Sequence, residues 1–159
     1  MNRLQSAFKN RKTVIPFITA GDPDIATTAQ LICRMDNAGA DIIILGLPFS
    51  DPVAADPVMQ TSYERALKNG MSADRLFDCV ERIRLDSNIP LVVMAYMNTI
   101  FVCGIDRLLA NAARVGIAAI IVPDVPYEEK SVLNDACNQN DIALITVIVP
   151  CSAERISML

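Results

Sequence analysis

The order of apolar and amphipathic segments is the feature of this chain that most restricts its fold. Short, continuously apolar runs alternate with longer runs in which apolar residues recur every three or four positions. Continuous apolarity is typical of strands in a parallel sheet, and the longer period is typical of helices that pack on such a sheet. The order therefore predicts an α/β fold with right-handed crossovers. The predicted strands are Thr13–Ala20, Asp41–Pro48, Pro90–Tyr96, Ala118–Val125 and Ala143–Pro150.

Helices are predicted between these strands. Asp22 and Pro23 are expected to be the N-cap and the first residue of a helix that runs to about Asn37, because Asp caps helix ends and Pro suits the first turn. The longer segment 49–70 predicts an ordered loop and an extra helix. Further helices are predicted to begin at Ser72, to include Leu108–Ala112, to include Glu128–Ala136 and to begin near Ser152.

Composition excludes several classes of protein. The formal net charge is −4 and the chain has no histidine, so we expect no nucleic-acid partner, no Ser-His-Asp nucleophile and no His-based metal site. The five cysteines form no C-x-x-C pair, and Cys33, Cys79 and Cys137 are predicted to be small core residues. No apolar run approaches the roughly 18 residues of a membrane span. These features predict a soluble, cytoplasmic protein without a membrane partner.

The chemistry of such a fold is expected where the strands end, because parallel α/β sheets carry their sites at the carboxyl ends of the strands. Here these ends read TAGDP, GLPFSDPVAADP, AYMNTIF, PDVPYEE and IVPCSAE. None of the five contains a glycine-rich nucleotide-binding motif. The segment pattern alone leaves two architectures open, an open doubly wound sheet and a segment of a barrel.

In order and in sequence, these strand ends resemble the tryptophan synthase alpha chain family over nearly the whole length of the chain. The most specific segments are PFITAGDP and GLPFSDPVAADPVMQ. The resemblance implies five (β/α) units of a (β/α)8, or TIM, barrel, as one partial domain over residues 1–159. The family cleaves indole-3-glycerol phosphate to indole and glyceraldehyde 3-phosphate in tryptophan biosynthesis and passes the indole to a beta subunit. The pyridoxal phosphate belongs to that subunit, so no cofactor and no metal are expected here.

Both acids on which the family's reaction depends are replaced in this chain. The family's general acid–base is a Glu two residues before the glycine of the second strand, and that position is Ile44 in ILGLPFSDP. The second carboxylate belongs to an S-D-P-x-A-D-G-P pattern, and its position in SDPVAADP is Ala55, with Asp56 one residue later. Ile44 has no proton to donate and Ala55 cannot accept one. The chain is therefore expected to be inactive by itself, with Asp56 as the candidate surrogate.

Other positions match the family. Phe17, Met94, Tyr96, Ile121 and Val147 correspond to residues at the indole end of the family's site. Two interpretations are open for these five side chains, an indole-binding surface and ordinary core packing. Tyr96 is either a phenol in the pocket or a strand-end aromatic.

The loops after the strands also match. The family's active-site and subunit-contact loop corresponds to Pro48, Phe49, Ser50, Asp51 and Pro52. Asp51 and Asp124 are interpreted as residues that organise their loops by accepting backbone N–H bonds. The family's phosphate loops follow later strands. The acid of TAGDP is expected to repel phosphate rather than bind it.

Two functions are therefore open. One is an indole-3-glycerol-phosphate lyase whose missing parts come from elsewhere, and the other is a non-catalytic half-barrel scaffold or beta-subunit-binding module. Five parallel strands of a barrel leave two unpaired sheet edges. With 52% hydrophobic residues, such a chain is expected to self-associate through these open edges.

Overall fold

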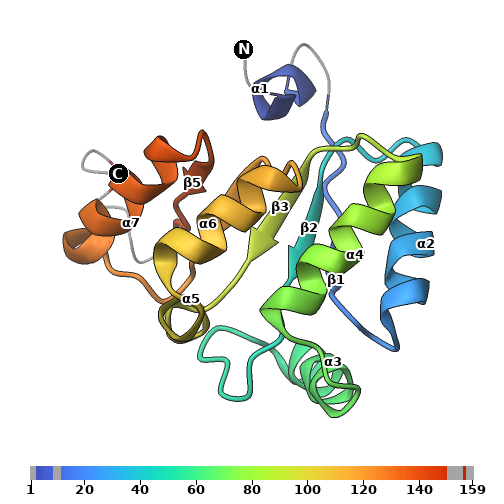
Figure 1. The fold of residues 1–159 in the computed structure, drawn as a ribbon, viewed down its shortest axis with the longest axis horizontal. Coiled ribbons are helices and arrows are strands. Elements are labelled where there is room, and N and C mark those ends of the chain that lie inside the picture. The colour runs from blue at the N-terminus through green and yellow to red at the C-terminus, as the bar shows by residue number, and fades with distance from the viewer. Residues whose placement is uncertain (1–2, 9–11, 150–155, 157–159) are drawn as a thin grey trace.

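Five parallel strands form one sheet in which each strand lies beside the next one in the sequence (Figure 1). The computed structural model describes residues 3–8, 12–149 and 156. The strands are β1 (Phe17–Thr19), β2 (Ile43–Gly46), β3 (Leu91–Met94), β4 (Ala119–Ile121) and β5 (Ala143–Ile145). An open doubly wound sheet reverses its strand order at a switch point, and this sheet does not. The order is that of a barrel segment, as the family resemblance implies.

Each observed strand lies inside a predicted run but is only three or four residues long. Prolines stand at or near the borders, with Pro16 before β1, Pro48 after β2 and Pro90 before β3. Proline has no N–H to donate to a sheet ladder, so these positions limit the paired segments. The end of the fifth predicted run, at Pro150, lies outside the described residues.

The helices occupy three positions around the sheet. Those along one face of the sheet are α2 (Ile25–Asn37), α4 (Ala73–Asp86), α6 (Ile105–Arg114) and α7 (Lys130–Gln139), the last preceded by the 3₁₀ turn η1 (Tyr127–Glu129) (Figure 1). At the carboxyl ends of β2 and β3 lie α3 (Pro57–Lys68) and α5 (Met97–Cys103), and α1 (Arg3–Ala7) lies at the opposite end. The seven-residue α5 was not predicted. The helix predicted near Ser152 lies outside the described residues.

The first long helix begins two residues later than the sequence predicts. Asp24, rather than Asp22, is the N-cap of α2, and its Oδ1 accepts the Thr27 N–H at 2.7 Å. The Asp22 carboxylate is engaged by Arg65 of α3 instead, at 2.6 Å. The predicted extra helix is confirmed as α3, with Asp56 as its N-cap.

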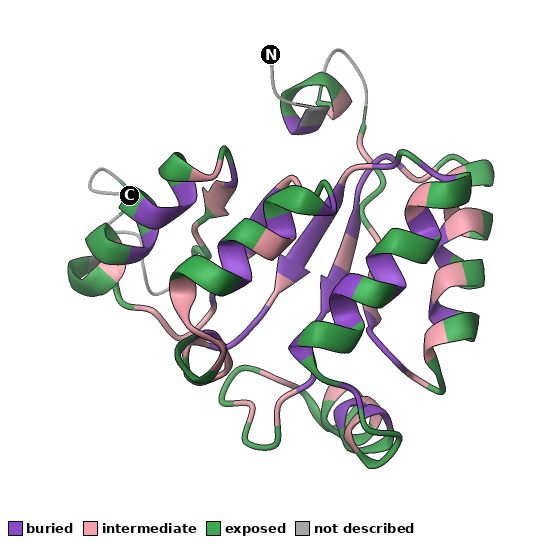
Figure 2. Cartoon of the chain, viewed as in Figure 1, coloured by how far each residue is buried: buried purple, intermediate pink, exposed green. Residues whose placement is uncertain are grey.

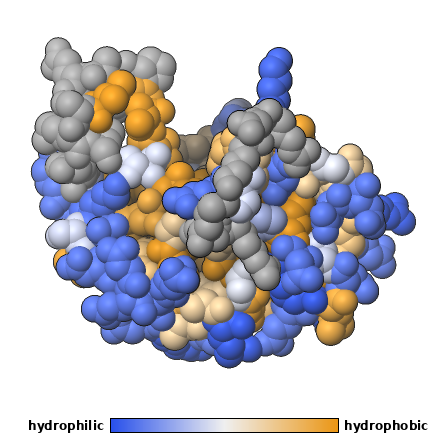
Figure 3. All heavy atoms as spheres, turned by 90° about the horizontal axis from the view of Figure 1, so that it is seen from above, coloured by the Kyte–Doolittle hydropathy of each residue, from blue (hydrophilic) through white to orange (hydrophobic). Residues whose placement is uncertain are grey.

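The two faces of the sheet are buried to different extents. Alternate strand residues such as Ile43, Leu45 and Val93 join the large core beneath the helices, where most buried residues lie (Figure 2). On the opposite, inner face, Leu4 of α1 packs in a small cluster with three residues, Ile42, Val92 and Ala119. Seen from above, the molecule is indented on the side away from the helices and carries hydrophobic side chains in its middle (Figure 3). The inner face is thus only partly covered.

Cysteine burial agrees with the prediction for two of the three helical cysteines. Cys79 and Cys137 are buried, and burial raises the pKa of each thiol to about 11. Cys33 is half-buried. Within the described ranges, no helix is long and apolar enough to cross a membrane. No group of three or more His, Cys, Asp or Glu side chains in those ranges could hold a metal ion.

Candidate functional site

Aromatic side chains crowd the carboxyl end of β2, where the acid-bearing loop begins. Gly46 permits this approach, because a Cβ at this position would lie 2.5 Å from Cζ of Phe17 and 3.2 Å from the hydroxyl oxygen of Tyr63. Tyr63 is 1% exposed, and its hydroxyl has no hydrogen-bond partner among the described residues. Burial raises the pKa of the Tyr63 hydroxyl. The centre of the site is therefore apolar and holds a buried phenol.

The two positions predicted to carry the family's acids, Ile44 and Ala55, lie in different settings. Ile44 is half-buried on the inner face and packs against the cluster that contains Ile42, Val92 and Ala119. Ala55 is half-buried just before α3, and its carbonyl accepts a hydrogen bond from Nε2 of Gln60 at 2.9 Å. Neither position offers a proton donor or acceptor side chain to a ligand.

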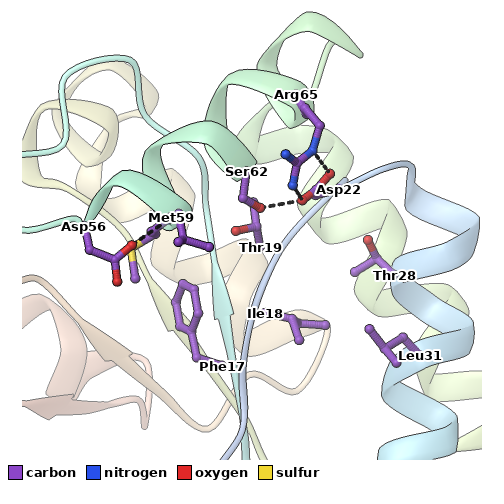
Figure 4. Close-up of a pocket in the computed structure, with 11 residues that line it drawn as sticks. Phe17, Ile18, Thr19, Asp22, Thr28, Leu31, Asp56, Met59, Ser62 and Arg65 are labelled. Atoms are coloured by element: carbon purple, nitrogen blue, oxygen red, sulfur yellow. Dashed lines mark hydrogen bonds and ion pairs between the residues drawn. The ribbon is translucent and has the colours of Figure 1, made fainter.

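Asp56 occupies a structural position. One of its carboxylate oxygens, Oδ1, accepts the Met59 N–H at 2.8 Å, which caps α3 (Figure 4). An N-cap side chain satisfies a backbone donor that the helix cannot. The side chain is exposed and lines a groove beside β1. Its role as a catalytic surrogate stays a prediction.

Four of the five residues assigned to the indole end of the site gather around the inner face. Phe17 pairs in register with Ile44, and Met94 pairs with Ile121; Phe17, Met94 and Ile121 are all half-buried. Tyr96 is buried, and its ring lies 5.4 Å from that of Phe49. Val147, in contrast, follows β5 and is 46% exposed. One partly open apolar surface is therefore lined by Phe17, Met94 and Ile121. The buried Tyr96 ring lies instead against Phe49, in the loop after β2.

Along the start of the loop after β2, the side chains become progressively more exposed. Pro48 is buried and Phe49 half-buried, while Ser50 and Asp51 are exposed. The Ser50 hydroxyl donates to Oδ2 of Asp51 at 2.6 Å. Asp51 thus accepts a hydrogen bond from the neighbouring Ser50 side chain. The sequence analysis predicted that it would accept one from a backbone N–H. The exposed part of the loop is free to meet another molecule.

Asp124 organises its loop as predicted. Its two carboxylate oxygens lie 2.9 and 3.1 Å from the Met97 nitrogen and accept its N–H. Because Met97 is the first residue of α5, this contact ties the loop after β4 to the helix after β3. The bond holds the first turn of α5 against the loop after β4.

A charged network that the sequence analysis missed lies beside β1. Nε and Nη2 of Arg65 donate to the two Asp22 oxygens at 2.9 and 2.6 Å, and the Ser62 hydroxyl donates at 2.5 Å (Figure 4). The Arg65 hydrogen bonds, followed by that of Ser62, hold the Asp22 pKa below its usual value, although partial burial acts in the opposite direction. The acid of TAGDP is therefore paired, which removes the simple repulsion of phosphate expected from it. The sequence does place Ser62 and Arg65 three residues apart, and therefore on one face of a helix. That spacing could have indicated a shared partner for the two side chains.

This network forms one wall of a groove of about 410 Å³. Strand β1 contributes Phe17, Ile18 and Thr19, and α2 contributes Leu31 (Figure 4). The start of α3 continues the wall that carries Ser62 and Arg65, with Met59 beside Phe17, and α2 lies across the groove from it (Figure 4). The groove is mixed in character, because its floor is apolar and its upper end carries the paired ions.

The family model described as Tryptophan synthase alpha chain matches residues 4–159. The chain belongs to this family. Among its relatives, the tryptophan synthase alpha chain of Clostridium kluyveri is 43% identical over 161 residues, which cover 98% of this chain and 61% of the relative. That of a Thermoanaerobacter species is 43% identical over 164 residues, covering 100% and 63%.

Solved structures of alpha chains have the same fold. The alpha chain of Legionella pneumophila matches 99% of this chain and 62% of its own length, with a TM-score of 0.92 and 31% identity. A chain of the tryptophan synthase complex from Pyrococcus furiosus matches with a TM-score of 0.79 and 36% identity, covering 83% of this chain and 55% of its own. This alpha-family chain spans about three-fifths of the length of the curated relatives it matches.

Proposed function

We propose that this chain is an alpha-type binding module that does not cleave indole-3-glycerol phosphate by itself. The proposal rests on Ile44, which occupies the family's acid–base position within an aliphatic cluster. A retro-aldol cleavage must deliver a proton to the indole ring and remove one from the glycerol hydroxyl, and one placed acid or base contributes about 10²–10⁴ in rate. The Asp56 carboxylate is exposed, and one of its oxygens accepts a hydrogen bond from the α3 backbone. The cleavage needs both a proton donor and a proton acceptor, and Asp56 is only one group.

We expect no release of indole from indole-3-glycerol phosphate by the 159-residue chain above a control without protein. The physical reason is the absence of a proton donor at Ile44 and of an acceptor at Ala55. Steady release would contradict this expectation. In that case Asp56→Asn is the informative variant, because Asn keeps the helix cap but removes the carboxylate. A loss of turnover in that variant would make Asp56 the surrogate and the chain a lyase.

The partner we propose is a tryptophan synthase beta subunit, to which the pyridoxal phosphate would belong. Solved structures similar to this chain include the tryptophan synthase a2b2 complex of Pyrococcus furiosus. At the carboxyl end of the sheet, the loop after β2 exposes Val53 and the start of α3 exposes Val58. Nearby, α5 exposes Phe101 and Val102. Apolar side chains exposed together on one rim are typical of a protein interface. We name these four residues the rim patch.

The beta reaction is expected to respond when this chain is added to a beta subunit. Phe101→Asp should weaken the response at least about tenfold, because it places a charge in the rim patch. Leu85→Asp is the matched control, since Leu85 is exposed on α4 outside that patch. The measurement is a titration of the rate of tryptophan formation from indole. A flat titration for the parent chain, or equal loss in both variants, would refute the proposed partnership.

Self-association is a second proposed property, together with a cytoplasmic location that suits the free cysteines. Large apolar side chains are exposed at both outer strands of the sheet, including Val14 near β1 and Val147 near β5. Unpaired parallel strands with exposed apolar side chains favour association with a further strand.

A further inference from the structure

The rim patch is divided between two parts of the chain. Val53 and Val58 lie on the loop after β2 and at the start of α3, whereas Phe101 and Val102 lie on α5. A partner meets all four side chains at once only if α5 keeps a fixed direction relative to that loop, because a binding surface loses affinity when its parts are misplaced. The contacts that hold α5 therefore help to set the partner surface.

The helix α5 has few contacts of its own that fix its direction. It is seven residues long, and of these seven, all described, Ile100 alone is buried. A helix of this length is not stable without tertiary contacts. Its N-cap residue, Tyr96, makes no side-chain cap hydrogen bond. The N–H groups of the first turn therefore need partners from outside the helix.

Asp124 supplies such a partner from the loop after β4. Its two carboxylate oxygens lie 2.9 and 3.1 Å from the Met97 nitrogen and accept its N–H. Asp124 stands between Pro123 and Pro126, and each proline fixes one φ angle of this turn. A carboxylate at the start of a helix also interacts favourably with the helix dipole. The start of α5 is thus attached to a restrained carboxylate.

The other part of the rim patch meets α5 at its N-cap. The Tyr96 ring is buried and lies 5.4 Å from the ring of Phe49, which belongs to the same loop as Val53. Aromatic rings at this separation attract each other. A displacement of the start of α5 would therefore also change its spacing from the loop after β2.

We propose that Asp124 is a positioning residue for the rim patch: by holding the first N–H of α5, it sets the direction in which Phe101 and Val102 face the partner. This inference rests on the proposed beta-subunit partnership and adds the residue that shapes its surface. Asp124 is half-buried, and it acts through α5 rather than through a contact of its own with the partner.

Two substitutions remove the same hydrogen bond from opposite sides. Asp124→Ala removes the acceptor, and Met97→Pro removes the donor at the first helix position, which tolerates proline. Tyr96, the residue before it, already has the extended backbone (φ −80°, ψ 147°) that a following proline favours. Each variant should raise the concentration of chain that gives half of the effect on the beta reaction at least about tenfold. The double variant should lose no more than either single variant, because all three lack the same bond.

Three control variants separate positioning from a general loss of stability. Asp124→Asn should keep most of the response, since its amide oxygen still accepts the Met97 N–H. Met97→Ala removes the methionine side chain but keeps the N–H, and it should respond like the parent chain. Asp24→Ala removes a carboxylate that caps α2 by bonds within that helix. It should lower stability without changing the response.

A second measurement does not need the partner. The chain contains no tryptophan, so Phe101→Trp places a single tryptophan on α5, and its fluorescence anisotropy reports motion on the nanosecond scale. In this background, Asp124→Ala and Met97→Pro should lower the anisotropy, and Asp124→Asn should not. A thermal melt of each variant checks folding, and Met97→Pro carries the test if Asp124→Ala does not fold.

Several results would overturn the positioning role. They are an unchanged anisotropy in Asp124→Ala, an unchanged titration in that variant while the parent chain is active, and a double variant that loses more than the single ones. Failure of both Asp124→Ala and Met97→Pro to fold would also overturn it, because the bond would then support the whole domain. A parent chain without effect on the beta reaction refutes the partnership instead, and the anisotropy still decides whether Asp124 holds α5.

Discussion

Arg84→Ala is expected to lower the free energy of unfolding by about 3 kcal/mol, since hydrogen bonds from a charged donor contribute about 1.5–3 kcal/mol each when partly buried and do not add fully. The Arg84 guanidinium donates to the carbonyls of Ser87 and Ile89 after α4 at 3.3 and 2.9 Å. It also donates to those of Val115 and Gly116 after α6 at 3.3 and 2.9 Å. One half-buried side chain thus joins the two connections that lead into β3 and β4.

The measurement is chemical denaturation of the parent chain and two further variants. Arg82→Ala is the matched control, because Arg82 lies on the same helix and is exposed, and it should change stability by less than about 0.5 kcal/mol. Arg84→Lys should recover only a part of the loss, since an ammonium cannot reach both connections as a planar guanidinium does. Equal stabilities of Arg84→Ala and Arg82→Ala would show that the four contacts contribute nothing net.

The positions of the strands could be predicted from sequence because apolarity is a local signal. Each of the five apolar runs contains an observed strand, although prolines shorten the paired part. The order of the strands could not be predicted from the pattern alone. An open sheet and a barrel segment share the same alternation, and only the pairing of β1 with β2, β2 with β3 and so on distinguishes them. The family resemblance supplied that step.

Two Asp-Pro pairs show that local sequence alone does not determine where a helix begins. Asp56-Pro57 opens α3 as an N-cap and a first-turn proline. Asp22-Pro23 has the same letters, but the helix after it is capped by Asp24. The difference lies in a partner 43 residues away in the sequence, Arg65, which binds the Asp22 carboxylate. A prediction made from neighbouring residues cannot include that contact.

The candidate site was predictable at the level of chemistry but not of packing. The sequence predicts the replacement of both family acids, at Ile44 and Ala55. The buried phenol of Tyr63 and the close approach of Phe17 to Gly46 are not predicted from it. They depend on how α3 folds back over the end of β2.

Ile44→Glu is expected to destabilise the chain by about 2 kcal/mol at neutral pH and by much less in acid, because a carboxylate would enter an aliphatic cluster. That cluster consists of Leu4, Ile42, Val92 and Ala119, and Ile121 packs against it. Burial disfavours the charged form, so the pKa of the new carboxyl should be higher in the folded chain than in the unfolded one.

The pH dependence fixes the sign of this effect. A group with a raised pKa in the folded state binds more protons there, so the penalty is absent below the unfolded pKa of about 4.3 and grows as pH rises through the folded pKa. The difference in stability between Ile44→Glu and the parent chain should therefore increase from acid to neutral pH. Ile44→Gln is the uncharged control, and its difference from the parent should stay constant. A constant difference for Ile44→Glu as well would show that the carboxylate reaches water through the open inner face, and that the acid was not excluded from this position by burial.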